Sequence, residues 1–205
     1  MDSPNTARHA QSVETRNKIY ETAIKLSKEK GFEQVTIREI CKEAEVSVGL
    51  FYKYFNSKED IFLEYSKINE ELYKNFRNSF SPEDTTLDRL ISFAKTNAKS
   101  GDSLIKGAGR FVYIHALKNP GEHFMTNIDR EVNTTIREII DYGISRGEIR
   151  KDIDREWLHR TILSCGWGCF FAYFSGIEPD VSLEDRMITA HRLIYEGVTV
   201  QKEDS

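Results

Sequence analysis

Residues that break helices or cross-link chains are scarce in this sequence. Only four of its 205 residues are proline, and three are cysteine. The cysteines are odd in number and no two form a Cys-x-x-Cys pair, which argues against a disulfide framework. Because the prolines lie where we expect helices to begin or end in any case, the rest of the chain is free to be helical; they are Pro4, Pro82, Pro120 and Pro179.

Long hydrophobic runs are also absent. No apolar stretch approaches the roughly 20 residues that a membrane-spanning helix needs. The polar segment from Met1 to Ser12 lacks the apolar centre of a signal peptide. We therefore expect a cytoplasmic protein that does not contact membranes.

Groupings typical of catalysis or metal binding are equally scarce. His115 and His123 lie eight residues apart with no third ligand nearby, and Cys165 and Cys169 are only two where zinc sites take four ligands. We find no nucleophile–base pair. The sequence therefore predicts no enzyme, no metal site and no cofactor. Buried thiols are the expected state of the two cysteines, and a redox-sensing role is the alternative.

A net positive charge, which a DNA-binding protein often carries, is missing as well. The chain has a net charge of −4. Residues 1–58 hold ten Lys and Arg against eight Asp and Glu, or +2, which leaves 19 basic and 25 acidic residues, or −6, for the remainder. This modest asymmetry fits a DNA-binding head on an acidic body.

Helical periodicity runs through the whole sequence, so the predicted fold class is all-α, with about nine helices. Residues 1–11 are expected to form a flexible tail. Residues 12–56 are expected to form a domain of three helices, and 57–79 a long connecting helix. The segment 80–205 is predicted to be a larger helical domain, in which a long helix begins at Pro120 and ends near Gly147.

The three-helix domain has the pattern of a helix-turn-helix. Thr36, with Glu39 three residues later, forms a capping box at the start of one helix. After a tight connector, Ser47 is a good N-cap for a short helix. In such a pair the second helix can enter the major groove of DNA. The inner sides of the two helices supply a small core: Ile37, Ile40, Cys41, Ala44, Val46, Leu50, Phe51 and Phe55.

The outer side of the short helix has the residue types that contact DNA. Gly49 lies inside the helix, where glycine costs about 0.8–1 kcal/mol relative to alanine. A backbone that must come close to DNA explains this choice. Tyr52 and Lys58 have the reach to contact phosphates. The residues left facing outward are Ser47, Val48, Gly49, Lys53 and Tyr54.

From Thr36 to Glu59 the chain reads TIREICKEAEVSVGLFYKYFNSKE. This stretch resembles the signature of the TetR family of transcriptional regulators, and the similarity covers about residues 13–62. The resemblance implies a dimer with an N-terminal helix-turn-helix and a C-terminal helical domain for ligand binding and dimerisation. One position departs from the pattern, because Glu45 stands where the family's turn carries glycine. A left-handed backbone there costs a non-glycine residue about 1–2 kcal/mol.

The resemblance also implies a DNA contact for each matching residue. Thr36 and Arg38 begin the second helix and are expected to contact the DNA backbone or a base. Only Arg38 and Lys53 have the reach for strong hydrogen bonds to guanine. The other implied contacts are Ser47, Val48 and Gly49 to the groove, with Val48 near a thymine methyl, and Tyr52, Tyr54 and Lys58 to phosphates.

In the family, the last two helices pair with those of a second subunit as a four-helix bundle. Here these helices are predicted over 154–175 and 182–198. Gly166 and Gly168 would permit close helix approach, and packing within one chain is the alternative. Residues expected at the interface are Trp157, Ile162, Cys165, Gly166, Cys169 and Tyr173.

A ligand pocket is expected among the helices from Leu87 to Ile144. The supply of aromatic residues suits a largely apolar ligand with a few polar anchors. Arg110 is the one charged residue in an apolar stretch and is the candidate contact for an anionic group. For every candidate, packing in the core is the alternative; they are Phe93, Asn97, Arg110, Phe111, Tyr113, Ile114, Phe124, Ile128, Trp167, Phe170 and Phe171.

These features predict a ligand-responsive transcriptional regulator. We expect a repressor that binds a palindromic double-stranded DNA operator as a homodimer and is released by a small, largely apolar effector. The alternative is a helical protein-interaction module whose DNA binding is lost or weak. Glu45 and the acidic isoelectric point favour this alternative.

Overall fold

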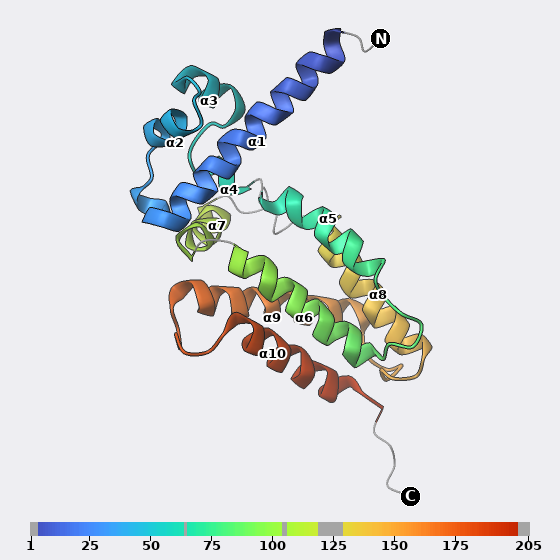
Figure 1. The fold of residues 1–205 in the computed structure, drawn as a ribbon. Helices are drawn as coiled ribbons and strands as arrows, with labels where there is room; N and C mark the ends of the chain where they lie inside the picture. The colour runs from blue at the N-terminus through green and yellow to red at the C-terminus, as the bar shows by residue number, and fades with distance from the viewer. Residues whose placement is uncertain (1–3, 64, 104–105, 119–128, 201–205) are drawn as a thin grey trace, which may run out of the picture. The chain divides into compact units, whose positions relative to one another are not determined.

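The computed structural model describes residues 4–63, 65–103, 106–118 and 129–200, and its regular elements over these ranges are helices (Figure 1). The chain divides into two compact units, Met1–Tyr65 and Ser66–Ser205. The division falls inside the segment predicted to be one connecting helix, which the structure describes as α4 (Asp60–Leu63) and α5 (Tyr65–Arg77). Among the described helices, none combines the length and apolar character that crossing a bilayer requires.

The first unit contains α1 (Pro4–Lys30), the 3-10 turn η1 (Phe32–Gln34), α2 (Ile37–Glu43) and α3 (Val48–Tyr54). The start of α1 corrects the expected flexible tail, since the helix begins eight residues before Ser12. Proline is tolerated in the first turn of a helix, and no glycine or further proline follows before Gly31. Gly31, with a φ of 86°, ends the helix as predicted.

The core of the first unit confirms most of the predicted inner face. Ile40, Cys41 and Ala44 of the helix-turn-helix are buried, as are Phe51 and Phe55. The other three predicted core residues are only half-buried, because they lie at the ends of these short helices or in the connector between them: Ile37, Val46 and Leu50. The preceding helix α1 adds Ile19, Ala23 and Leu26.

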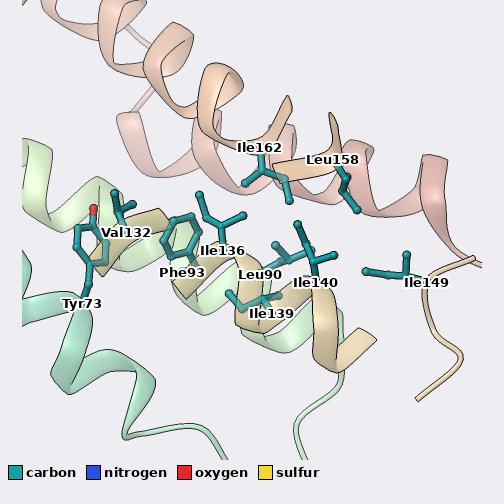
Figure 2. Packing of buried hydrophobic residues seen from close by; sticks show 10 residues of the cluster. All are labelled: Tyr73, Leu90, Phe93, Val132, Ile136, Ile139, Ile140, Ile149, Leu158 and Ile162. Atoms are coloured by element: carbon teal, nitrogen blue, oxygen red, sulfur yellow. The ribbon is translucent and has the colours of Figure 1, made fainter. Parts of the chain in front are cut away.

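Over its described residues, the second unit is built from α5 and five further helices around a core of aliphatic and aromatic side chains. They are α6 (Thr86–Ser103), α7 (Lys106–Lys118), α8 (Glu131–Ser145), α9 (Arg155–Ser175) and α10 (Leu183–Val198). Helix α6 packs against α8 and α10, and α9 contacts α7, α8 and α10 (Figure 1). Figure 2 shows the buried cluster that these elements enclose: Tyr73, Leu90, Phe93, Val132, Ile136, Ile139, Ile140, Ile149, Leu158 and Ile162.

The start of α8 differs from the predicted helix that began at Pro120. Arg130 is extended, with φ −67° and ψ 145°, and the helix begins at Glu131. Residues 119–128 lie outside the described part of the chain. Glu70 of α5 holds this helix end, because its carboxylate accepts the Glu131 backbone N–H at 2.6 Å and the Arg130 Nε–H at 2.7 Å. A negative charge at a helix N-terminus is favourable.

The last two helices confirm their predicted bounds. The Asp154 carboxylate accepts the Trp157 backbone N–H at 2.9 Å, and the Ser182 hydroxyl accepts the Asp185 N–H at 3.0 Å. Both are N-cap bonds that satisfy donors left free at a helix start. Gly176, in the left-handed region with a φ of 74°, ends α9.

Candidate nucleic-acid interface

Helix α2 begins at a complete capping box. The Thr36 hydroxyl accepts the Glu39 backbone N–H at 3.2 Å, while the Glu39 carboxylate accepts the Thr36 N–H at 2.9 Å. The same carboxylate accepts a bond from Lys30 of α1 at 3.1 Å. The bond from the Thr36 backbone, followed by those from the Lys30 and Thr36 side chains, lowers the pKa of Glu39 to about 2. The Thr36 hydroxyl is therefore already bonded to Glu39, although the residue itself is exposed to solvent.

The orientation of α3 is set by one buried aromatic side chain. Ser47 caps the helix by accepting the Leu50 N–H at 3.1 Å. Phe51 is fully buried, and its ring contacts Phe55 at a centroid separation of 5.8 Å. The opposite side of α3 is therefore turned to solvent. It consists of Ser47, Val48, Gly49, Tyr52 and Lys53, with Val48 42% and Tyr52 53% exposed.

Among the described residues, nothing requires glycine at position 49. A Cβ atom built on Gly49 would meet only the Ser47 hydroxyl oxygen, at 4.0 Å, and its backbone is not in the left-handed region. The residue nevertheless carries the helix-propensity cost of glycine. Neither packing nor backbone conformation within the described residues therefore accounts for the glycine.

The side chains that flank this exposed surface are placed differently from one another. Arg38 in the first turn of α2 is exposed. Tyr54 is half-buried, and its hydroxyl accepts a bond from the Ser12 hydroxyl of α1 at 3.2 Å. The Lys53 ammonium lies 5.9 Å from the centre of the Tyr54 ring. Lys53 and Arg38 are thus two long basic side chains that the helix-turn-helix presents to solvent.

Lys58, predicted to contact a phosphate, has its ammonium bonded within the chain. Its ammonium donates to the backbone carbonyls of Phe32 and Val35, both at 2.8 Å, and lies 4.4 Å from the centre of the Phe32 ring. The side chain therefore fastens the connector between α1 and α2 to the segment that precedes α4. No local pattern could reveal this role, because the carbonyls lie 23 and 26 residues away.

The turn between α2 and α3 has the predicted left-handed residue. Glu45 has a φ of 53°. Its carboxylate pairs with Lys18 of α1 at 3.1 Å, and both side chains are largely exposed. Such surface pairs contribute little. The turn is therefore kept in shape by the helices around it despite an unfavourable residue.

The predicted ligand-binding residues fall into two separate groups. In the first, the Tyr113 hydroxyl of α7 donates to the Trp167 carbonyl of α9 at 2.7 Å, and its ring lies 5.8 Å from that of Phe171. Burial raises the pKa of Tyr113. Arg110 Nε donates to the Phe174 carbonyl at 2.7 Å, so this part of the predicted anion contact is already bonded within the chain.

The second group lies in the core of Figure 2. Phe93 is buried against Tyr73, whose hydroxyl donates to Asn97. His191 of α10, which the sequence analysis did not select, is fully buried with its ring 5.7 Å from that of Phe93. Of the other candidates, Phe111, Trp167 and Phe170 are half-buried, Ile114 and Phe171 are exposed rather than lining an interior, and Phe124 and Ile128 lie outside the described residues.

Comparison with known proteins agrees with this architecture. Residues 19–65 match the family described as bacterial regulatory proteins, tetR family. An uncharacterised HTH-type transcriptional regulator, YvdT of Bacillus subtilis (strain 168), is 26% identical over 82% of this chain and 86% of its own. The HTH-type transcriptional repressor KstR2 of Rhodococcus jostii (strain RHA1) is 24% identical over 74% of this chain and 76% of its own.

A solved structure shows the same fold over nearly the full length. It is the TetR-family repressor FadR of Thermus thermophilus in complex with lauroyl-CoA, with a TM-score of 0.70 and 22% identity over 93% of this chain and 98% of that one. An exposed α3 on a helix-turn-helix, joined to a helical second unit, defines a DNA-binding transcriptional regulator. Residues 19–65 carry the match to the tetR family, and the chain as a whole is similar to regulators of this kind.

Proposed function

We propose that this regulator is a repressor that binds a palindromic operator as a homodimer and is released by a small, largely apolar effector. Helix α3 enters the major groove, with Ser47, Val48, Gly49 and Lys53 facing the bases. Tyr52 and Tyr54 contact phosphates, and Thr36 and Arg38 approach the DNA from the start of α2. Lys58 is left out of this set because its ammonium is engaged within the chain.

The observation that carries the proposal is the solvent-exposed side of α3. It combines small residues that allow close approach, a valine that suits a thymine methyl group, and one long cation. The vacant space beside Gly49 gives this combination its strongest support, because a DNA backbone or base edge would fill it.

A homodimer through α9 and α10 is supported by the large apolar side chains on these helices. Trp157 is 65% and Leu193 62% exposed, and Phe171 is exposed as well. Contiguous exposed apolar surface marks interaction sites. Ile162, predicted at the interface, is buried in the chain's own core and is not part of this surface. A two-fold dimer presents two α3 helices at about 34–36 Å, one turn of DNA.

The apolar character of the effector is supported by the aromatic residues of α6, α7 and α9 and by one similar protein. FadR of Thermus thermophilus holds lauroyl-CoA, a ligand with a long acyl chain. An effector releases DNA only if it binds the conformation that does not bind DNA more tightly. Segment 57–79 joins the two units in sequence and would transmit this difference.

DNA binding is tested by fluorescence anisotropy with a duplex taken from the region flanking the regulator's own gene. Affinity should fall steeply with salt concentration, because phosphate contacts release counterions. Replacing Lys53 with alanine should weaken specific binding at least about fivefold, since a good contact to a base is worth about 1–3 kcal/mol.

The matched control is Lys95→Ala, an exposed lysine on α6 in the second unit, which should bind DNA within about twofold of the native chain. If Lys53→Ala bound DNA as tightly as the native chain, the proposed contact between α3 and the DNA would be wrong. If the native chain shows no site-specific, salt-sensitive binding, the protein-interaction module with lost DNA binding is the better assignment.

Gly49→Ala separates folding from DNA contact. The added methyl group meets open space inside the chain, so the free energy of unfolding should rise by up to about 1 kcal/mol. Affinity for the operator should nevertheless fall, because the methyl group occupies the space proposed for DNA. Urea titration and anisotropy measure the two effects, and unchanged affinity would show that DNA does not approach this position.

The dimer is tested by sedimentation of Leu193→Asp, with Leu117→Asp on α7 as the control. Leu117 is 82% exposed, so both substitutions place a charge on the surface of a helix in the second unit. Only Leu193→Asp should give a monomer and lose operator affinity.

The apolar effector is tested by adding lauroyl-CoA or coenzyme A to the complex of the regulator with its operator. Lauroyl-CoA should release the DNA and coenzyme A alone should not, and release by both would contradict an apolar effector.

A further inference from the structure

Helix α9 leaves one narrow side uncovered by the rest of the chain. Exposed residues recur along it at spacings of four, three, four, three and four: Trp157, Thr161, Ser164, Gly168, Phe171 and Ser175. Spacings of three and four keep residues on one side of a helix. These six residues, which we call the α9 seam, extend over about 27 Å at 1.5 Å per residue. Cys165 and Cys169, which the sequence predicts to be buried, border the seam and are half-buried.

The α9 seam is exposed, yet it has the composition of a covered surface. Residues 161–177 contain no charged side chain. The opposite side of α9 lies in the core of its own chain through Leu158 and Ile162. A helix with one side in water normally carries charged residues there, whereas a helix that is apolar all round is buried. The composition of α9 therefore indicates that a second surface covers the seam.

The spacing of the seam is the same in both directions along the helix. A two-fold interface uses the same patch on both copies, so the patch must be complementary to itself. Only one antiparallel register of two α9 helices places every seam residue opposite another seam residue. In this register the contacts are Trp157 with the partner's Ser175, Thr161 with the partner's Phe171, and Ser164 with the partner's Gly168.

The sizes of the opposed residues are complementary. Each of the two aromatic residues of the seam lies opposite a small residue, and facing large and small side chains fill space without voids or clashes. A Cβ atom built on Gly168 would meet nothing within 4 Å, so the chain itself leaves room for a close approach at the centre. A parallel pairing in register would instead oppose Trp157 to the partner's Trp157, which separates the helices at Gly168.

The charges at the two ends of α9 also favour the antiparallel pairing. Arg160 is exposed in the second turn, with its guanidinium 5.2 Å from the centre of the Trp157 ring, whereas the last turn carries no charged side chain. In the antiparallel register Arg160 lies beside the partner's last turn of α9. The helix dipole places partial negative charge at that end, which favours a nearby cation.

We propose that the homodimer is built on the α9 seam, with two antiparallel copies of α9 and each aromatic residue of one copy packed on a small residue of the other. This inference rests on the homodimer of the proposed function and adds which residues meet. A seam about 27 Å long and about 10 Å wide covers less than the roughly 800 Å² per partner of a standard interface. Helix α10, which packs against α9 and exposes Leu193, supplies the remainder.

The test exchanges the large and the small residue of one contact and measures the dimer dissociation constant by sedimentation equilibrium. Thr161→Phe forces an aromatic ring against the partner's Phe171, and Phe171→Thr leaves a gap there, so each should weaken the dimer at least about tenfold. The double variant restores one large and one small residue per contact and should return to within about threefold of the native chain. Within one copy the two positions are about 15 Å apart, so this recovery arises between copies.

Thr161→Phe combined with Trp157→Thr is the matched control. It also exchanges an aromatic residue for a small one, but Trp157 lies opposite the partner's Ser175, so the dimer should not recover. The Phe171 ring also contacts Tyr113 within the chain, and thermal melting of each variant shows that it is folded. A dimeric native chain whose double variant is folded but does not recover would overturn the proposed register.

Cross-linking gives a second measurement that does not depend on the size exchange. Thr161→Cys chains mixed with Phe171→Cys chains should be joined by a short bis-maleimide at these two positions, as located by peptide mass mapping. Trp157→Cys mixed with Phe171→Cys should not be joined there, and the reverse result would contradict the register. A native chain that is monomeric in sedimentation would instead contradict the homodimer of the proposed function itself.

Discussion

Lys58 is a basic residue of the DNA-binding head whose charge is used inside the protein. Lys58→Met keeps the apolar stem but removes the bonds to the Phe32 and Val35 carbonyls, so the free energy of unfolding should fall by about 1–3 kcal/mol. Lys53→Met on the exposed side of α3 should change it by less than about 0.5 kcal/mol. Urea titration distinguishes the two. If Lys58→Met left the free energy of unfolding unchanged but weakened DNA binding, the phosphate contact predicted from the sequence would be the better assignment for Lys58.

Glu45 occupies a backbone conformation that glycine adopts without strain. Glu45→Gly should raise the free energy of unfolding by about 1 kcal/mol, since the left-handed conformation costs other residues about 1–2 kcal/mol. Glu45→Ala is the control, because it removes the ion pair with Lys18 but keeps the strain. If both variants gained equally in urea titrations, the carboxylate and not the backbone would be the cause.

At the scale of elements, close packing of α7 on α9 depends on Gly109. A Cβ atom there would lie 2.4 Å from the Phe174 ring, which is buried and stacked on Phe170. Gly109→Ala should therefore lower the free energy of unfolding by about 1–3 kcal/mol, as overpacking does. Gly49→Ala, where the added methyl group meets open space, should instead raise the free energy of unfolding. Equal effects at the two sites in urea titrations would show that helix propensity outweighs packing.

Elements whose ends are fixed by nearby residues could be predicted from the sequence. The caps at Thr36, Ser47, Asp154 and Ser182 all form as local patterns indicate. The start of α8 could not be predicted in this way, because Glu70, about 60 residues earlier, holds it.

The same distinction applies to the candidate sites. The exposed side of α3 follows from helical periodicity and one buried aromatic anchor, Phe51, so the sequence alone predicts it. The bonds of Lys58 to the Phe32 and Val35 carbonyls and of Arg110 to the Phe174 carbonyl join distant segments, and no spacing signals them. Polar residues that look like ligand contacts in a sequence are therefore hard to separate from those that bond within the chain.

At the scale of the molecule, two buried histidines should make the second unit sensitive to acid. Burial lowers the pKa of both His159 and His191 below the ordinary value of 6.5. Between that value and the folded pKa the unfolded chain binds more protons than the folded one. Stability is therefore complete above about pH 6.5 and is lost as the pH falls below it.

Urea midpoints at pH 7.5 and pH 5.5 measure this loss. His191→Phe removes one titrating group that is fully buried against Phe93. Whatever its absolute stability, this variant should lose less between the two pH values than the native chain does. A pH dependence equal to that of the native chain would show that His191 does not contribute.

The short length of α3 limits how many base pairs it can distinguish. Seven helical residues span about 10 Å, which is about three base-pair steps of 3.4 Å. In the proposed homodimer, two copies would distinguish about six base pairs, a combination that recurs about once in four thousand positions, whereas a bacterial chromosome offers about a million competing sites or more. Base readout alone therefore cannot single out one promoter, and the bendability and groove width of the intervening DNA must supply the missing discrimination.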